Sequence, residues 1–89
     1  MSDLCHYFGL TIRQVRELKR WSQETLAESA DLNRSYVGEI ERGKVIPSLV
    51  TIDKLSLALG MSLPELLAHC EQLRRARTAL VFDLASIAC

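Results

Sequence analysis

Apolar residues recur at helical spacing in two short stretches in the first half of the chain. In the first stretch, Leu26, Ala27 and Ala30 fall at i, i+1 and i+4 among polar neighbours. In the second, Val37 and Ile40 lie three residues apart, and the residues around them are polar. A residue that can accept hydrogen bonds from the free amides of a helix start precedes each stretch: Ser22 and Asn33. The pattern therefore predicts two amphipathic helices with a very short connection.

The connection consists of Asp31 and Leu32, and its shortness forces the two helices to cross steeply and touch. Ala27 supplies the small side chain that such a contact needs. Asp31 lies where the turn requires a left-handed backbone, which Gly tolerates best and Asn or Asp next. Leu32 closes the apolar angle between the helices. These spacings are those of a DNA-binding helix-turn-helix motif over residues 23–43, with a recognition helix at about 33–42.

Further apolar stripes predict helices on both sides of this motif. The first helix, loosened at Gly9, carries Leu4, Tyr7, Phe8, Ile12, Val15 and Leu18, with Trp21 at its end. Pro47 cannot continue the recognition helix, and Ser48 caps a fourth helix. That helix faces the core with Leu49, Ile52, Leu55 and Leu59, and a fifth follows with Leu66, Leu67, Cys70 and Leu73. The expected fold class is all-α, a compact five-helix domain over residues 1–71.

Residues 72–89 form an apolar extension whose secondary structure the pattern leaves open. Leu80, Leu84 and Ile87 fit helical spacing, whereas the run from Leu80 to Phe82 would suit a strand. Ala79, Ala85 and Ala88 favour a helix. An exposed apolar stretch would be a liability for a small domain, so the extension either covers the core or contacts a partner chain. We expect a homodimer.

Four segments resemble the Cro/CI-type (XRE-like) helix-turn-helix family. They are I-R-Q-V-R from Ile12, W-S-Q-E-T-L-A from Trp21, N-R-S-Y-V-G-E-I-E-R-G-K from Asn33 and A-L-G-M-S-L-P-E-L-L from Ala58. The resemblance covers Gly9 to Leu67 and extends to small phage repressors and to controller proteins of restriction-modification systems. It implies a lambda-repressor-like fold and a transcription regulator that binds operator DNA. Arg20 and Asp31 stand where this family more often has Gly.

In such a motif the N-terminal part of the recognition helix faces base edges in the major groove. Arg34 can donate two hydrogen bonds to a guanine, Ser35 can donate or accept, and Glu39 can accept from a cytosine amino group. Gly38 removes bulk and lets the backbone approach the groove. Taken singly, each charged residue could equally be an ordinary solvated side chain.

Contacts to the DNA backbone would position the protein without reading sequence. The candidates from the residues are Tyr36, Arg42 and Lys44, and the resemblance adds Gln23 as a phosphate contact. The resemblance also implies an ion pair between Arg16 and Glu41. If solvated, such a pair contributes about 0–1 kcal/mol, whereas a buried pair is costly to break.

The charge balance qualifies the DNA-binding prediction. The chain has 11 basic and 11 acidic residues, and neither half carries an excess. A positive surface must therefore arise by segregation, with Arg34, Arg42 and Lys44 joined by Arg13 on one side.

One dimer would cover two operator half-sites and block or recruit RNA polymerase. The alternative function is a protein-interaction module with the same fold, such as an antitoxin that holds a toxin.

The sequence offers no catalytic, cofactor or metal site. The cysteines Cys5, Cys70 and Cys89 are far apart, and with His6 and His69 they lack the usual metal-ligand spacings, so buried thiols are the better interpretation. Neither a Gly-rich phosphate loop nor a Ser/His/Asp arrangement is present. No apolar run approaches the roughly 18 residues of a membrane span, and no leader opens the chain, so we expect a cytoplasmic protein.

Overall fold

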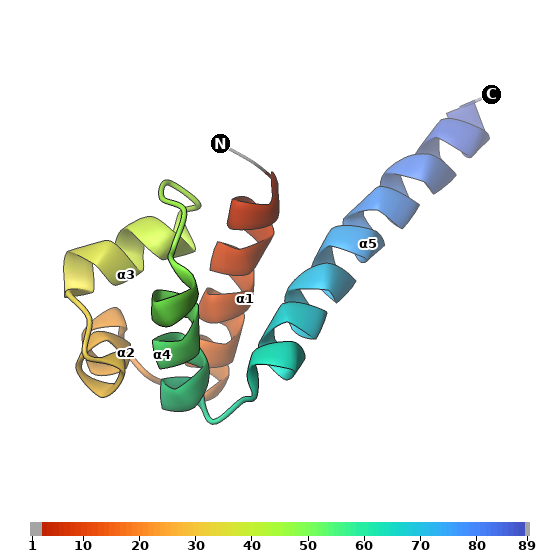
Figure 1. Ribbon diagram of the computed structural model, residues 1–89. Coiled ribbons are helices and arrows are strands. Elements are labelled where there is room, and N and C mark those ends of the chain that lie inside the picture. The colour runs from red at the N-terminus through yellow and green to blue at the C-terminus, as the bar shows by residue number, and fades with distance from the viewer. Residues whose placement is uncertain (1–2, 89) are drawn as a thin grey trace.

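The computed structural model describes the backbone of residues 3–88 and the side chains of residues 3–77, and it shows a helical domain (Figure 1). Residues 3–88 contain no strand, so the all-α prediction is confirmed and the extension is helical as far as Ala88. The helices are α1 (Asp3–Leu18), α2 (Gln23–Ala30), α3 (Arg34–Glu41), α4 (Leu49–Leu59) and α5 (Leu63–Ala88).

Polar side chains fix the starts of four helices. The predicted caps Ser22, Asn33 and Ser48 each accept a hydrogen bond from a backbone N–H in the first turn of α2, α3 and α4. At the start of α5, the Ser62 N–H donates to the Glu65 carboxylate at 3.1 Å, and the Glu65 N–H donates to the Ser62 hydroxyl at 3.2 Å. This reciprocal pair satisfies two amides that the helix leaves free. The bond from the Ser62 amide lowers the pKa of the Glu65 carboxyl.

Left-handed backbone occurs at two residues other than glycine in the part of the chain that the structure describes. They are Arg20, with φ 60°, and Asp31, with φ 55°. These are the two positions where the Cro/CI-type family more often has Gly, because a side chain crowds the following carbonyl in this conformation. Asp31 ends α2 by donating its N–H to the carbonyls of Ala27 and Glu28. The predicted turn at Asp31 is therefore confirmed.

The core lies where α1, α2 and α3 meet, and α4 and α5 close it. Its fully buried side chains include Ile12, Leu26, Val37, Ile40, Leu55 and Leu66. Burial of each such side chain contributes about 1.5–3 kcal/mol. The sequence suggested that Gly9 loosens α1. Gly9 instead lies buried where α1 crosses α3. A Cβ at Gly9 would meet the backbone carbonyl oxygen of Ile40 at 2.3 Å, so only glycine permits this crossing.

Two leucines predicted to face the core are exposed instead. Leu18 is 80% exposed and Leu49 is 78% exposed. Leu18 ends α1 and Leu49 begins α4, so each lies beyond the packed middle of its helix. Helical spacing assigns a residue to a face, but it does not show how far the neighbouring helices extend along that face.

The first part of α5 packs on α1, with Leu66 and Cys70 buried between the helices. Beyond this contact α5 continues past the N-terminal end of α1 and leaves the other four helices (Figure 1). The helix is uninterrupted at residue 71, where the sequence analysis placed the end of the domain. Among residues 3–88, no helix is both long and apolar enough to cross a membrane.

Candidate nucleic-acid interface

The helix α3 has a buried side and a polar side. Val37 and Ile40 face the core and are almost completely buried. Arg34 and Ser35 are exposed on the polar side, where Glu39 is half-buried. The start of α3 is fixed by Asn33, whose side chain accepts a hydrogen bond of 2.8 Å from the Ser35 N–H. The polar side is therefore held on a rigid element.

A surface depression of about 420 Å³ lies along this polar side. It brings together every predicted DNA-contacting residue except Tyr36. Its lining residues are Gln23, Arg34, Ser35, Gly38, Glu39, Arg42 and Lys44. Tyr36 is half-buried and packs at the edge of the core, and its role as a DNA-backbone contact stays a prediction.

The charges around the depression are predominantly positive, although the whole chain is neutral. Three cations line it, from Arg34, Arg42 and Lys44, against the single carboxylate of Glu39. None of these cations forms an ion pair with another residue of the described side chains, 3–77. Arg13, which the sequence analysis added to this group, pairs with Glu17 at 3.6 Å instead and does not line the depression. The positive surface arises by segregation.

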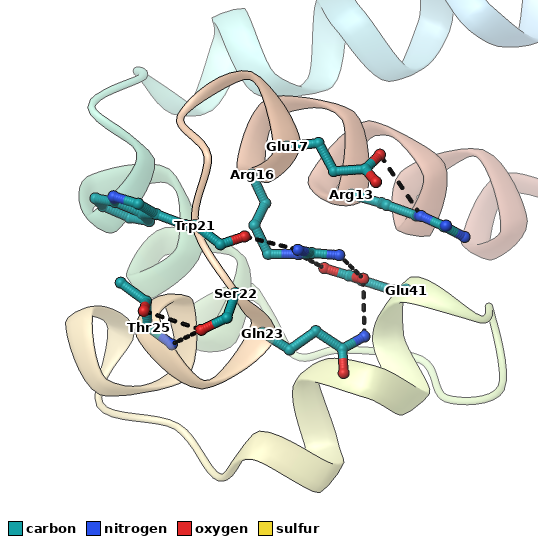
Figure 2. A network of polar contacts seen from close by, with 8 residues as sticks. All are labelled: Arg13, Arg16, Glu17, Trp21, Ser22, Gln23, Thr25 and Glu41. Carbon is teal, nitrogen blue, oxygen red and sulfur yellow. Dashed lines mark hydrogen bonds and ion pairs between the residues drawn. The ribbon is translucent and has the colours of Figure 1, made fainter.

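The second carboxylate of α3 belongs to Glu41 and points inward, where the structure brings it together with Arg16 (Figure 2). The Arg16 Nε donates to one carboxylate oxygen at 2.7 Å, and its Nη2 donates to the other at 3.0 Å. The side chains of Arg16 and Glu41 are 12% and 3% exposed. The hydrogen bond with Glu41 raises the pKa of Arg16, and burial opposes this only in part. The guanidinium therefore stays charged.

Two further bonds extend this pair into a network. The Arg16 Nη1 donates to the backbone carbonyl of Trp21 at 2.8 Å, and the Gln23 Nε2 donates to the Glu41 carboxylate at 3.0 Å (Figure 2). The network thus joins α1, the turn after it, α2 and the end of α3. Gln23 belongs both to this network and to the lining of the depression, so it connects the buried pair to the outer surface. Helical spacing does not predict this connection, because only the fold places Gln23 beside Glu41.

Cys5 and Cys70 take no part in this region. Cys5 and Cys70 are buried thiols, as predicted, and Cys89 lies outside the described residues. Burial raises the pKa of the Cys70 thiol, which keeps it protonated at neutral pH. The described residues contain no group of three or more His, Cys, Asp or Glu side chains that could hold a metal ion.

An apolar depression of about 150 Å³ lies beside the segment that follows α3. Its lining includes three exposed side chains from three parts of the chain: Leu4 of α1, Ile46 before α4, and Leu67 of α5. Leu49 and Val50, which follow Ile46 along the chain, are also exposed. This surface was not predicted from the sequence, because the helical spacing assigned Leu49 to a core-facing stripe and gave no face to Leu67.

Comparison with known proteins gives matches over most of the chain. A family model described as Helix-turn-helix matches residues 12–66. Control protein C.MunI from Mycoplasma sp is 40% identical over 73 residues, which cover 81% of this chain and 99% of that protein. The crystal structure of the restriction-modification controller protein C.AhdI from Aeromonas hydrophila has a TM-score of 0.70 and 48% identity, and the match covers 74% of this chain and 98% of that chain.

A further solved structure shares the fold at lower identity. It is the restriction-modification controller protein C.Esp1396I, solved as a tetramer in complex with its natural 35 base-pair operator. Its TM-score is 0.70 and its identity 24%, over 79% of this chain and 97% of that chain. The helix-turn-helix family match and the two relatives at 40% and 48% identity favour a transcription regulator over the antitoxin-like interaction module.

Proposed function

Because this chain belongs to the helix-turn-helix family, we propose that it is a sequence-specific DNA-binding transcription regulator, a dimeric repressor or controller protein. It works in the cytoplasm and catalyses no reaction. The observation that carries this proposal is the depression along α3, where three cations without an ion-pair partner among residues 3–77 lie beside one carboxylate. A surface that sets three cations against one carboxylate beside a recognition helix is suited to a polyanion.

The residues of the depression divide between reading and positioning. We assign the base edges to Arg34, Ser35 and Glu39. Arg34 and Ser35 begin α3, whose N-terminal part faces the groove in such a motif, and Glu39 lines the same depression about one turn further along the helix. Backbone phosphates would take the remaining contacts, from Gln23, Tyr36, Arg42 and Lys44. Gln23 has a second N–H beside the one that Glu41 accepts, and this second N–H is available to a phosphate oxygen.

One such unit reads only a few base pairs, so the proposal includes a second copy on a neighbouring half-site. The apolar depression around Ile46 supports this, because it is lined by exposed apolar side chains that a second copy could cover. Ile46→Asp should convert a dimer to a monomer in sedimentation velocity. Leu57→Asp is the matched control, because Leu57 is exposed to a similar degree and lies outside this depression. A dimer that survives Ile46→Asp would instead point to the extension of α5.

Fluorescence anisotropy tests the DNA-binding proposal directly. The probe is a duplex taken from upstream of the chain's own gene, and a scrambled duplex of the same length is the control. We expect tight binding to the upstream duplex and an affinity that falls steeply with salt, because phosphate contacts release counterions. Equal affinity for both duplexes would contradict sequence-specific recognition, and no binding to either would contradict the DNA-binding function.

A further inference from the structure

Gly38 is the one position on the polar side of α3 that has no side chain. Arg34, Gly38 and Arg42 follow one another at intervals of four residues and therefore lie along the same side of the helix. A Cβ at Gly38 would lie 3.1 Å from the Nη1 of Arg42 and 3.5 Å from the Oε1 of Gln23. The guanidinium of Arg42 therefore lies across Gly38, beside the space that a side chain at this position would fill.

The backbone of α3 does not require this glycine. Gly38 lies within the helix, and the glycines with positive φ in the described chain are Gly43 and Gly60. In a helix interior, glycine is less favourable than alanine. The feature that Gly38 does provide is room for the Arg42 side chain.

Arg42 is well placed to use this room. Helical side chains point back toward the N-terminus, so the head group of a residue covers the turn before its own Cα. Arg42 follows the last residue of α3, yet its guanidinium reaches the Gly38 turn and lines the depression. It has no ion-pair partner among residues 3–77. Its charge and donors are therefore available to a ligand at the middle of the helix.

We propose that Arg42 reads a guanine in the major groove and that Gly38 is the positioning residue that gives it access. This inference rests on the proposed function and revises one part of it, since Arg42 was first assigned to the DNA backbone. The guanidinium is a planar fork that can donate two parallel bonds to the O6 and N7 of guanine. A methyl group at position 38 would force the fork to move by a few tenths of an ångström.

Selection from a pool of duplexes with a randomised central segment tests the Arg42 assignment and does not require a defined operator sequence. The wild-type protein should enrich a motif with a guanine at a defined position of each half-site. Arg42→Ala should lose that preference and keep the others, and its affinity for the wild-type motif should fall about tenfold. Arg42→Lys keeps the charge but not the fork, so it should relax the same position. Lys44→Ala is the control, and it should weaken binding with an unchanged motif.

The role of Gly38 needs a readout that a merely structural role would not move. Gly38→Ala should relax the same base position as Arg42→Ala, while its melting temperature is unchanged or raised. The double variant with both alanines should show no further loss at that position, because Gly38 acts through Arg42.

Three outcomes would separately contradict base reading by Arg42, positioning by Gly38 and the proposed function. If Arg42→Ala weakens binding to all duplexes equally and leaves the motif intact, Arg42 is a backbone contact and the inference is wrong. If Gly38→Ala alters a different position, or none, Gly38 does not position Arg42. If the wild-type protein enriches no motif at all, the proposed function itself fails.

Discussion

Two glutamates lie two residues apart on α3, one on each side of the helix. Glu41 is buried and accepts hydrogen bonds from Arg16 and Gln23. Glu39 is half-buried, lines the outer depression and forms no ion pair among residues 3–77. Residues two apart on a helix point in nearly opposite directions. The side of the helix, rather than the residue type, therefore decides whether a charge supports the fold or is available to a ligand.

The two sides should respond differently to substitution. Changes on the inner side remove partners from a buried network, so they should lower stability. Changes on the outer side remove groups without intramolecular partners, so they should lower DNA affinity at constant stability.

Arg16→Ala should have the largest effect. It leaves the Glu41 carboxylate buried without its charge partner, and we expect a loss of about 3–5 kcal/mol in the free energy of unfolding. For a domain of this size, the melting temperature should fall by more than about 10 °C. Thermal unfolding followed by circular dichroism measures this shift.

Arg13→Ala is the matched control for this experiment. Arg13 lies on the same helix and pairs with Glu17, but both side chains are more than half exposed. Its loss should cost no more than about 0.5 kcal/mol. Equal melting temperatures for wild type and Arg16→Ala would show that the inner pair contributes nothing.

Much of this fold could be predicted from the sequence because the signals are local. The residues that begin or end a helix act within one turn of it: Asp31 ends α2, and the caps Ser22, Asn33 and Ser48 begin α2, α3 and α4. The apolar spacing in α2 and α3 then identified the buried side of each helix, and hence the polar side of α3.

The parts that could not be predicted depend on contacts between distant segments. Gly9 looked like a weak point in α1 until α3 was seen to cross it. Gln23 required the fold to bring it to Glu41. Leu49 fitted a core-facing stripe, but it lies at a helix end that no neighbouring helix covers. The sequence also left the gathering of three cations undecided, because an even charge balance is compatible with many surfaces.

Arg34→Ala should give the next largest effect, now on binding rather than stability. We expect a loss of about 1–3 kcal/mol in the free energy of DNA binding, concentrated at one base position. The melting temperature should stay within about 1 °C of wild type, since Arg34 is exposed and has no ion-pair partner among residues 3–77. Anisotropy with duplexes that differ at single base pairs measures the loss in binding free energy, and thermal unfolding measures the melting temperature. A uniform loss over all duplexes would make Arg34 a phosphate contact.

Lys44→Ala should have a smaller effect on the same side. A lysine that contacts one phosphate contributes about one unit to the dependence of log affinity on log salt. We therefore expect the slope to become shallower by about that amount, with the preferred sequence unchanged. An unchanged slope, measured by anisotropy at several salt concentrations, would place Lys44 away from the DNA.

The smallest expected effect concerns pH and the inner pair. The hydrogen bond with Glu41 raises the pKa of Arg16. The stability that the charged guanidinium contributes is therefore fully present below the pKa of Arg16 in the unfolded chain, and it is lost as pH rises through the pKa of Arg16 in the folded chain. Both values lie far above neutrality. Burial raises the pKa of Cys70 in the folded chain, so this thiol ionises first in the unfolded chain and lowers stability as pH rises. This loss is the same in wild type and in Arg16→Ala, so it cancels in the difference between their free energies of unfolding. The gap in unfolding free energy between wild type and Arg16→Ala should therefore be equal at about pH 7 and about pH 10 in urea titrations. A gap that narrows at the higher pH would mean that Arg16 loses its proton there, contrary to the geometry of the buried pair.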